Sequence, residues 1–254
     1  MISYNHFLLE SKRKSIRGFD REIREMENLL SKSRRLESSN KEIAEYHRTQ
    51  AEKILSDIYA KILPKIEDTK KEFEQYLKKL AKKEKLQEPK IVLRIKSIDS
   101  VVNKVIDRGK DFATMGDLVA ASIITREDDE PEKIYKNILR KYSSNVVDAE
   151  AKRRGGDSKY GNYGTYHVDM MINGMVTELQ IMTRKMWSYK KAAHDIYSKT
   201  RAKQELSRFD QALSKKLFSM GNMPRYVREY VEMYGIDDVS LLEEIFEKNY
   251  VETT

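Results

Sequence analysis

The sequence predicts an α/β (α+β) protein in which a mixed β-sheet is flanked by helices, with helical extensions at both ends. Helical periodicity dominates the first third, strand-like runs alternate with helices in the middle, and an Asn173-Gly174 turn joins two of these runs. The 254 residues are 39% hydrophobic, which is enough to fill a core, and include no cysteine. A disulfide framework, a thiolate nucleophile and a zinc site with sulfur ligands are therefore excluded.

Three predicted regions differ in charge. A helical region at 1–88 has a net charge of +5, a core at 89–204 has +7, and a helical extension at 205–254 has −4. The basic core favours a polyanionic ligand, either nucleotide phosphates or nucleic acid, and a general lysine-rich composition is the alternative explanation. The chain starts without the apolar stretch of a signal peptide, and no apolar run approaches the ~20 residues that span a membrane. We therefore expect a soluble, cytoplasmic protein.

The first region is predicted to be helical throughout. Apolar residues recur at helical spacing over 5–36 and 40–63, and Asn40 is a plausible N-cap of the second helix. Pro64 stands where a helix can restart, so 65–86 is expected to be the next helical segment.

The core opens with a strand followed by a helix. Residues 91–93 are a short apolar run, and residues 98–106 place apolar side chains at i, i+3 and i+4. Ser97 is the natural N-cap of this helix. Arg94 and Lys96 then lie beside a helix N-terminus, where unpaired backbone N–H groups favour anions.

Strands and helices continue to alternate after this point. A buried strand is expected at 117–125, opening with Asp117, and a helix is expected at 131–142. A further strand is expected near 145–147. The segment 148–164 contains four glycines and a basic cluster, so it predicts a mobile basic loop.

A hairpin is the clearest local prediction. Residues 165–172 and 175–182 are strand-like runs, and Asn173-Gly174 between them favours a two-residue turn. One face of this hairpin is apolar and is expected to face the core. A helix is expected at 184–203, and shorter helices are expected within 205–249.

The register of this hairpin places four polar side chains on one face. It sets His167 opposite Gln180 and Asp169 opposite Glu178. Two opposed carboxylates repel each other unless a cation lies between them, they share a proton, or both reach solvent. For an isolated hairpin solvent exposure is the simplest explanation, whereas Asp117 on a neighbouring strand favours a metal site. Oxygen ligands without cysteine then indicate Mg²⁺.

Five segments carry a recognisable set of motifs. They are Arg94–Ser97 followed by Lys104, Asp117–Ser122, Lys159–His167, Thr177–Thr183, and Ala193-His194 with Lys199. Together, over about residues 60–204, they resemble the synthetase domain of the RelA/SpoT family, especially its small alarmone synthetases. The resemblance implies a nucleotidyltransferase-like fold and the transfer of pyrophosphate from ATP to the 3′-hydroxyl of a nucleotide.

The resemblance also implies roles for the matched residues. Asp117 and Glu178 would hold Mg²⁺, and Glu178 would also be the base for the 3′-hydroxyl. Arg94 would stack on adenine, while the triphosphate would be lined by Lys96, Ser97 and Lys104.

The acceptor nucleotide has its own matched residues. Tyr163 would stack on the acceptor base, with Asn162 beside it, while Lys159 and His167 would contact acceptor phosphates. Additional candidates near the site are Asp169, Gln180, His194, Lys199, Arg153 and Arg154.

The leading functional hypothesis is a synthetase that makes (p)ppGpp from ATP and GTP or GDP. Residues 1–88 lack the His-Asp hydrolase motif of the family, so we expect synthesis without degradation. Three features depart from the family pattern. Ser122 and Met182 stand where arginine is usual, and the order Gly161-Asn162 reverses the usual Asn-Gly that helps to recognise guanine.

Two alternatives stay open at this point. Some relatives are toxins of toxin–antitoxin or phage-defence systems that pyrophosphorylate the 3′-CCA end of tRNA. The basic clusters at 152–154 and 184–185 and the altered guanine loop favour this version, with an antitoxin protein as a further partner. The other alternative is a nucleotide- or RNA-binding regulator that has lost catalysis, for which the two missing arginines would be the signature.

Overall fold

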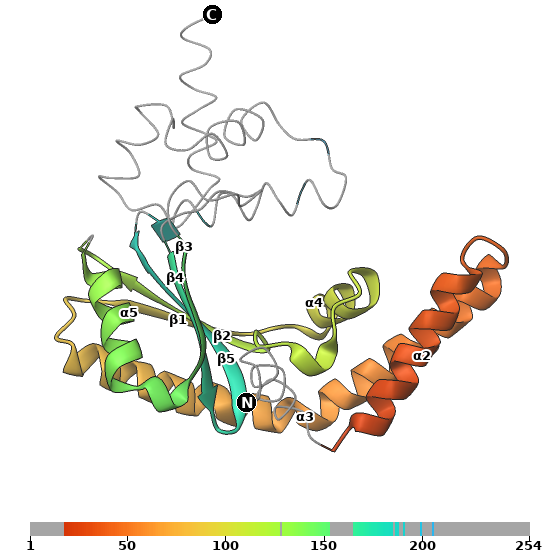
Figure 1. The fold of residues 1–254 in the computed structure, drawn as a ribbon, viewed down its shortest axis with the longest axis horizontal. Helices are drawn as coiled ribbons and strands as arrows, with labels where there is room; N and C mark the ends of the chain where they lie inside the picture. The colour runs from red at the N-terminus through yellow and green to blue at the C-terminus, as the bar shows by residue number, and fades with distance from the viewer. Residues whose placement is uncertain are drawn as a thin grey trace, which may run out of the picture.

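The computed structural model of the chain describes residues 18–127, 129–152 and 165–184, and beyond them residues 186, 187, 190, 199 and 205. Helices α2 (Asp20–Leu36) and α3 (Lys41–Lys83) precede a five-stranded sheet. Figure 1 shows α3 running along one side of the sheet and α2 lying against its first half, beyond the sheet edge. The helices predicted within 205–249, and most of the one predicted at 184–203, lie outside the described residues.

The sheet is mixed, as the sequence predicts. Its strands are β1 (Lys90–Ile95), β2 (Val119–Thr125), β3 (Val146–Lys152), β4 (Thr165–Ile172) and β5 (Met175–Thr183). They lie in the order β1-β2-β5-β4-β3. Strands β2 and β5 are parallel, and the other neighbours are antiparallel. The β2–β5 contact joins segments far apart in the sequence.

The core lies between the sheet and two helices. Helix α3 packs against β1, β2 and β4, while α5 (Glu130–Lys141) packs against β4 and β5. The α3 side chains Phe73 and Leu77 are fully buried there together with Leu179 and Ile181 of β5. One face of the sheet is thereby committed to the core, and polar side chains of β4 and β5 lie on the other.

Helix α3 corrects one prediction. We expected a break at Pro64, but the helix runs through it without interruption from Lys41 to Lys83. Its apolar stripe, which includes Ile62 and Ile66 on either side of the proline, is buried in the core. Tertiary packing therefore outweighs the loss of the hydrogen bond that Pro64 cannot donate.

Replacing this proline provides a test. Pro64→Ala is expected to raise the free energy of unfolding by about 1–3 kcal/mol, because it restores a backbone N–H and removes the clash with the preceding turn. Urea denaturation would measure the change. The matched control Lys61→Ala, at an exposed position of the same helix, should stay within about 0.5 kcal/mol of the wild type. A Pro64→Ala variant that is less stable than the wild type would contradict this account.

The predicted hairpin is confirmed. Its turn pairs Ile172 with Met175, so His167 lies opposite Gln180 and Asp169 opposite Glu178. Asn173 and Gly174 have φ values of 49° and 66°, as a turn of this kind requires.

The segment before the hairpin differs from the prediction. Residues 148–152 do not belong to a loop; they continue β3, which starts at Val146 and pairs with β4. The charged side chains of this stretch masked its strand character in the sequence. The pairing places Asp148 opposite Asp169, which lies opposite Glu178, so three neighbouring strands each contribute one carboxylate to the same row.

The helix after β1 has two parts. Ser97 caps α4 (Ile98–Val102) by accepting a hydrogen bond from Ser100 N, as predicted. The chain then widens into a π turn at Asn103–Asp107, where Arg108 N donates to Asn103 O at 3.2 Å. The predicted cap of α3 is also confirmed, since Asn40 Oδ1 accepts from Ile43 N at 3.1 Å. Apolar spacing alone cannot distinguish an α turn from a π turn.

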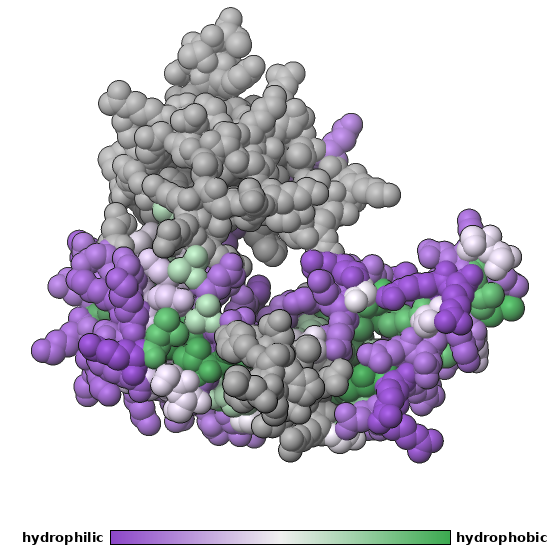
Figure 2. All heavy atoms as spheres, in the orientation of Figure 1, coloured by the Kyte–Doolittle hydropathy of each residue, from purple (hydrophilic) through white to green (hydrophobic). Residues whose placement is uncertain are grey.

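Helix α2 and the first half of α3 form what we call the arm. Figure 2 shows mostly hydrophilic side chains over the arm, with hydrophobic ones in a strip along it. Ile23, Met26 and Leu30 of α2 are buried against α3. Among the helices in the described part of the chain, none combines the length and apolar character needed to cross a membrane.

Candidate active site

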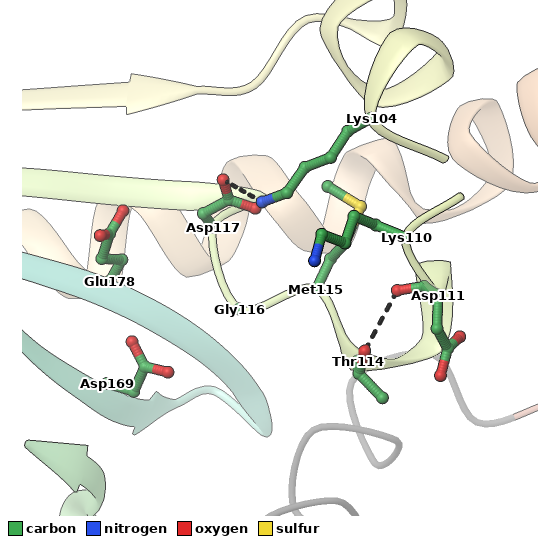
Figure 3. Close-up of a pocket in the computed structure, with 9 residues that line it drawn as sticks. All are labelled: Lys104, Lys110, Asp111, Thr114, Met115, Gly116, Asp117, Asp169 and Glu178. Carbon is green, nitrogen blue, oxygen red and sulfur yellow. Dashed lines mark hydrogen bonds and ion pairs between the residues drawn. The ribbon is translucent and has the colours of Figure 1, made fainter. Parts of the chain in front are cut away.

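A polar cleft of roughly 330 Å³ opens on the face of the sheet opposite α3 and α5. It is lined by Lys104, Lys110, Asp111, Thr114, Met115, Gly116, Asp117, Asp169 and Glu178. Figure 3 shows Lys104 reaching Asp117, with Glu178 on β5 and Asp169 on β4 beside them. Four carboxylates and two lysines therefore line one cavity.

Strand pairing explains how these carboxylates meet. Asp117 lies two residues before β2, and the parallel pairing of β2 with β5 sets Ala120 beside Glu178. Antiparallel pairing then sets Asp169 of β4 beside Glu178. Gly116 lies close to the hairpin, because a Cβ placed on it would be 3.2 Å from Val176 Cγ1 and 3.4 Å from Asp169 Oδ2.

Two lysines share one oxygen of Asp117. The Nζ atoms of Lys96 and Lys104 each lie 2.8 Å from Asp117 Oδ2. The three side chains are only 16%, 26% and 17% exposed, in that order. Burial raises the pKa of Asp117, but hydrogen bonds from Lys104 and Lys96 outweigh it and hold the pKa below its usual value. Tyr59 of α3 supports this arrangement, because its hydroxyl donates to Lys96 O at 2.6 Å.

Glu178 is held by neighbours on its own face. Its Oε1 lies 3.2 Å from His167 Nδ1 and accepts a hydrogen bond from Gln180 Nε2 at 2.9 Å. Burial raises the pKa of Glu178, yet the hydrogen bonds from His167 and Gln180, with the charges of His167 and Lys190, lower it to about 2. Glu178 is thus an ionised acceptor at neutral pH.

The donor set fits a hard divalent cation. Asp117 Oδ1 is buried and has no hydrogen-bond partner, although Oδ2 of the same carboxylate has two. An orphaned carboxylate oxygen beside a cleft that also holds Glu178 and Asp169 suits Mg²⁺ better than a softer metal. Within the described ranges, no group of three or more His, Cys, Asp or Glu side chains is already arranged as a metal site.

A smaller pocket adjoins this cleft on the same face of the sheet. It has a volume of about 40 Å³ and is lined by Val92, Arg94, Ala120, Ala121, Ser122, Gln180, Trp187 and Lys190. Lys190 donates a hydrogen bond to Gln180 Oε1 and lies 5.1 Å from the centre of the Trp187 ring. Arg94 is exposed at this pocket, opposite Ala120 in the β1–β2 register.

The structure places some of the predicted site residues in or beside the cleft and leaves others outside the described ranges. The cleft brings together Asp117, Glu178, Lys104 and Asp169, with Lys96 bound to Asp117. Arg94 and Gln180 line the adjoining pocket, His167 contacts Glu178, and Ser97 caps α4. Lys199 itself is helical and of intermediate burial. Outside the described residues are Lys159, Asn162, Tyr163, His194, Arg153 and Arg154.

Sequence reasoning missed part of the cleft. Lys110, Asp111 and Gly116 come from the segment that connects the π turn to β2. Gly109, with a φ of 64°, and Gly116 bracket this segment, and its Lys-Asp pair just before a buried strand was an available signal. Lys190 was missed as well, because it approaches from beyond β5.

Residues 93–203 match a family model described as the region found in RelA / SpoT proteins. A curated relative, guanosine-3′,5′-bis(diphosphate) 3′-pyrophosphohydrolase of Spiroplasma citri, is 26% identical over 218 residues. That alignment covers 78% of this chain but only 28% of the relative.

Two solved structures are similar to this chain. Small alarmone synthetase 2 of Bacillus subtilis superimposes with a TM-score of 0.50 at 18% identity, over 68% of this chain and 95% of that one. A GTP pyrophosphokinase family protein of Streptococcus pneumoniae gives a TM-score of 0.48 at 18% identity, over 64% and 85% of the two chains. Residues 93–203 therefore resemble the region found in RelA / SpoT proteins, and the chain shares its fold with small alarmone synthetase 2.

Proposed function

We propose that the chain is an ATP-dependent pyrophosphokinase that transfers pyrophosphate from ATP to the 3′-hydroxyl of GTP or GDP, making (p)ppGpp. The observation that carries the proposal is the cleft in which Lys96 and Lys104 meet Asp117 beside Glu178, within the region that resembles RelA / SpoT proteins. Positive and negative groups lie there side by side, as a reaction between two polyphosphates requires.

The reaction is a single displacement. The 3′-oxygen of the acceptor bonds to the β-phosphorus of ATP, the bond from that phosphorus to the α–β bridging oxygen breaks, and AMP leaves. The hydroxyl proton passes to a carboxylate or to solvent. Such a transfer depends on positioning and charge stabilisation more than on covalent chemistry.

The phosphate end of the cleft is formed by lysines. Lys96 follows β1 and Lys104 follows α4, so their ammonium groups approach Asp117 from two elements. We propose that both turn from Asp117 to the triphosphate when ATP binds. Asp117 and Glu178 would hold Mg²⁺, which supplies charge neutralisation at the phosphates.

The acceptor end is formed around Glu178. Its carboxylate is ionised, so it can accept a hydrogen bond from the 3′-hydroxyl and aim the oxygen at the β-phosphorus. A carboxylate with a pKa of about 2 is a weak base. We therefore propose that orientation is the larger part of its contribution, and that Tyr163 and Lys159 bind the acceptor from the segment before β4.

The 3′ end of tRNA is the second candidate acceptor. The reversed Gly161-Asn162 order favours it, as do the basic residues at 152–154 and 184–185. Arg184, directly after β5, is exposed, and its Nη2 donates a hydrogen bond to Glu88 O at 3.3 Å. If tRNA is the acceptor, binding should weaken steeply with salt, because each phosphate contact releases counterions.

One incubation distinguishes these candidates. The protein is mixed with γ-³²P-ATP, Mg²⁺ and GDP, GTP or deacylated tRNA, and the products are separated. Label on GDP or GTP supports the first candidate, and label on tRNA supports the second. A guanosine nucleotide without its 3′-hydroxyl is the matched control and should take up none. Absence of label from every acceptor would refute pyrophosphate transfer and favour a binding-only regulator.

A further inference from the structure

The π turn at Asn103–Asp107 determines where Lys104 lies. On one side, Val105 and Ile106 are buried in the core. On the other, Lys104 Nζ reaches Asp117 at 2.8 Å. π turns often occur at functional sites, where they redirect a side chain. The position of this ammonium group therefore depends on how the turn is held against the rest of the protein.

The outer end of the turn is tied to the arm. Asp107, its last residue, accepts a hydrogen bond on Oδ1 from Arg48 Nη2 of α3 and one on Oδ2 from Asn103 Nδ2 at 2.8 Å. Arg48 also contacts Glu52, one helical turn further along, with Nε 3.2 Å from Oε1. Arg48 and Asp107 are 59 positions apart, so this contact is a tertiary one.

A second contact joins the arm to the same segment. A Cβ placed on Gly109 would lie 3.0 Å from Arg34 Nη2, so the guanidinium of this α2 residue rests against the Gly109 backbone. The next residue, Lys110, lines the cleft and donates its backbone N–H to Lys104 O at 3.1 Å. Both helices of the arm thus contact the segment that carries the cleft lysines.

We infer that Arg48 is a positioning residue for the reaction: through Asp107 it seats the π turn so that Lys104 reaches Asp117 and the phosphates of the nucleotide. A lysine has a long flexible stem, and fixing its base lowers the cost of ordering it on a ligand. The part of this inference that concerns the nucleotide rests on the proposed function, whereas the Lys104–Asp117 contact does not.

The first test is nucleotide affinity. Isothermal titration with a non-hydrolysable ATP analogue and Mg²⁺ would compare wild type, Arg48→Met and the control Glu52→Gln, which removes only the second partner of Arg48. Arg48 and Asp107 are 40% and 34% exposed, and ion pairs this accessible to solvent contribute modestly. We therefore expect Arg48→Met to bind the ATP analogue about fivefold more weakly than the wild type does. The control should bind like the wild type. Equal affinity of Arg48→Met and wild type would overturn the inference.

A double-mutant cycle separates positioning from general support. In a Lys104→Met background, Arg48→Met should have no further effect on affinity, because the side chain that it positions is gone. The same fivefold loss in both backgrounds would mean that Arg48 acts on the fold rather than on Lys104, and would refute the inference. If Arg48→Met does not fold, Asp107→Asn replaces it, since that variant keeps an acceptor for Asn103.

A ligand-free measurement distinguishes failure of this inference from failure of the proposed function. Acetic anhydride labelling followed by mass spectrometry gives the reactivity of Lys104 relative to Lys61, which is exposed on α3. We expect Arg48→Met to raise this ratio about fivefold over Glu52→Gln. An unchanged ratio overturns the positioning role. A raised ratio in a protein that binds no ATP analogue supports the positioning role and refutes the proposed function.

Discussion

Glu178→Gln is expected to reduce pyrophosphate transfer by about 10³-fold while the fold stays intact. Glutamine has nearly the same shape, but it lacks the charge that orients the acceptor hydroxyl and attracts a divalent cation. The side chain is 19% exposed and lies in a face shared with His167 and Gln180, so a shape-preserving change is needed to isolate the charge. Initial rates with γ-³²P-ATP and the acceptor that takes up label would measure the loss.

The control for this variant is Glu132→Gln, an exposed change of the same kind on α5 that leaves the cleft untouched. It should keep the wild-type rate. Circular dichroism and the melting temperature should match in all three proteins. A Glu178→Gln protein that retains wild-type turnover, or one that unfolds, would contradict the role proposed for this carboxylate.

Asp117→Asn is expected to have two large effects. Transfer should fall by about 10²- to 10³-fold, because the orphaned Asp117 oxygen can no longer offer a charge to Mg²⁺. Stability should fall by about 1–3 kcal/mol, because Lys96 and Lys104 lose the carboxylate that they share while mostly buried. Urea denaturation measures the second effect, and Mn²⁺ binding by electron paramagnetic resonance, with and without ATP, measures the loss of the cation.

Asp68→Asn provides the comparison for this pair of effects. Asp68 pairs with Lys71 on the exposed side of α3, where both side chains are more than 60% exposed. Its loss should change stability by less than about 1 kcal/mol and should leave Mn²⁺ binding as it was. Unchanged stability and unchanged Mn²⁺ binding in Asp117→Asn would remove the basis for a cation site at β2.

Much of the local structure was predictable, because local chemistry sets it. Asn173-Gly174 fixes a two-residue turn, and the turn fixes which residues of β4 and β5 share a face. The caps at Asn40 and Ser97 follow equally from short polar side chains that accept backbone N–H bonds. These predictions needed no knowledge of distant parts of the chain.

The mistakes have a common origin in tertiary contacts. Pro64 stays inside α3 because the apolar side chains before and after it are buried. The presence of a proline in the sequence gives no indication of this packing. Residues 148–152 extend β3 because β4 supplies their partners, although their composition is typical of a loop. The π turn at 103–107 is invisible in a pattern of apolar positions.

The sequence predicted which residues form the candidate site better than it predicted how they contact one another. The resemblance of the motifs to a family named Asp117, Glu178, Lys96 and Lys104 in advance. It did not reveal that both ammonium groups bind one oxygen of Asp117, since that geometry depends on three separate elements. Nor did it indicate Arg48, which lies outside every matched motif and touches the site only through Asp107.

The shared oxygen of Asp117 has a consequence for the order of events in the cleft. Before substrate binds, the ammonium groups of Lys96 and Lys104 and the carboxylate of Asp117 neutralise one another. A divalent ion binding alone would be repelled by the two ammonium groups, and a triphosphate binding alone would be repelled by the carboxylate of Asp117. If the divalent ion and the triphosphate bind together as a complex, the lysines can pair with the triphosphate while Asp117 pairs with the ion. No buried charge is then left without a partner.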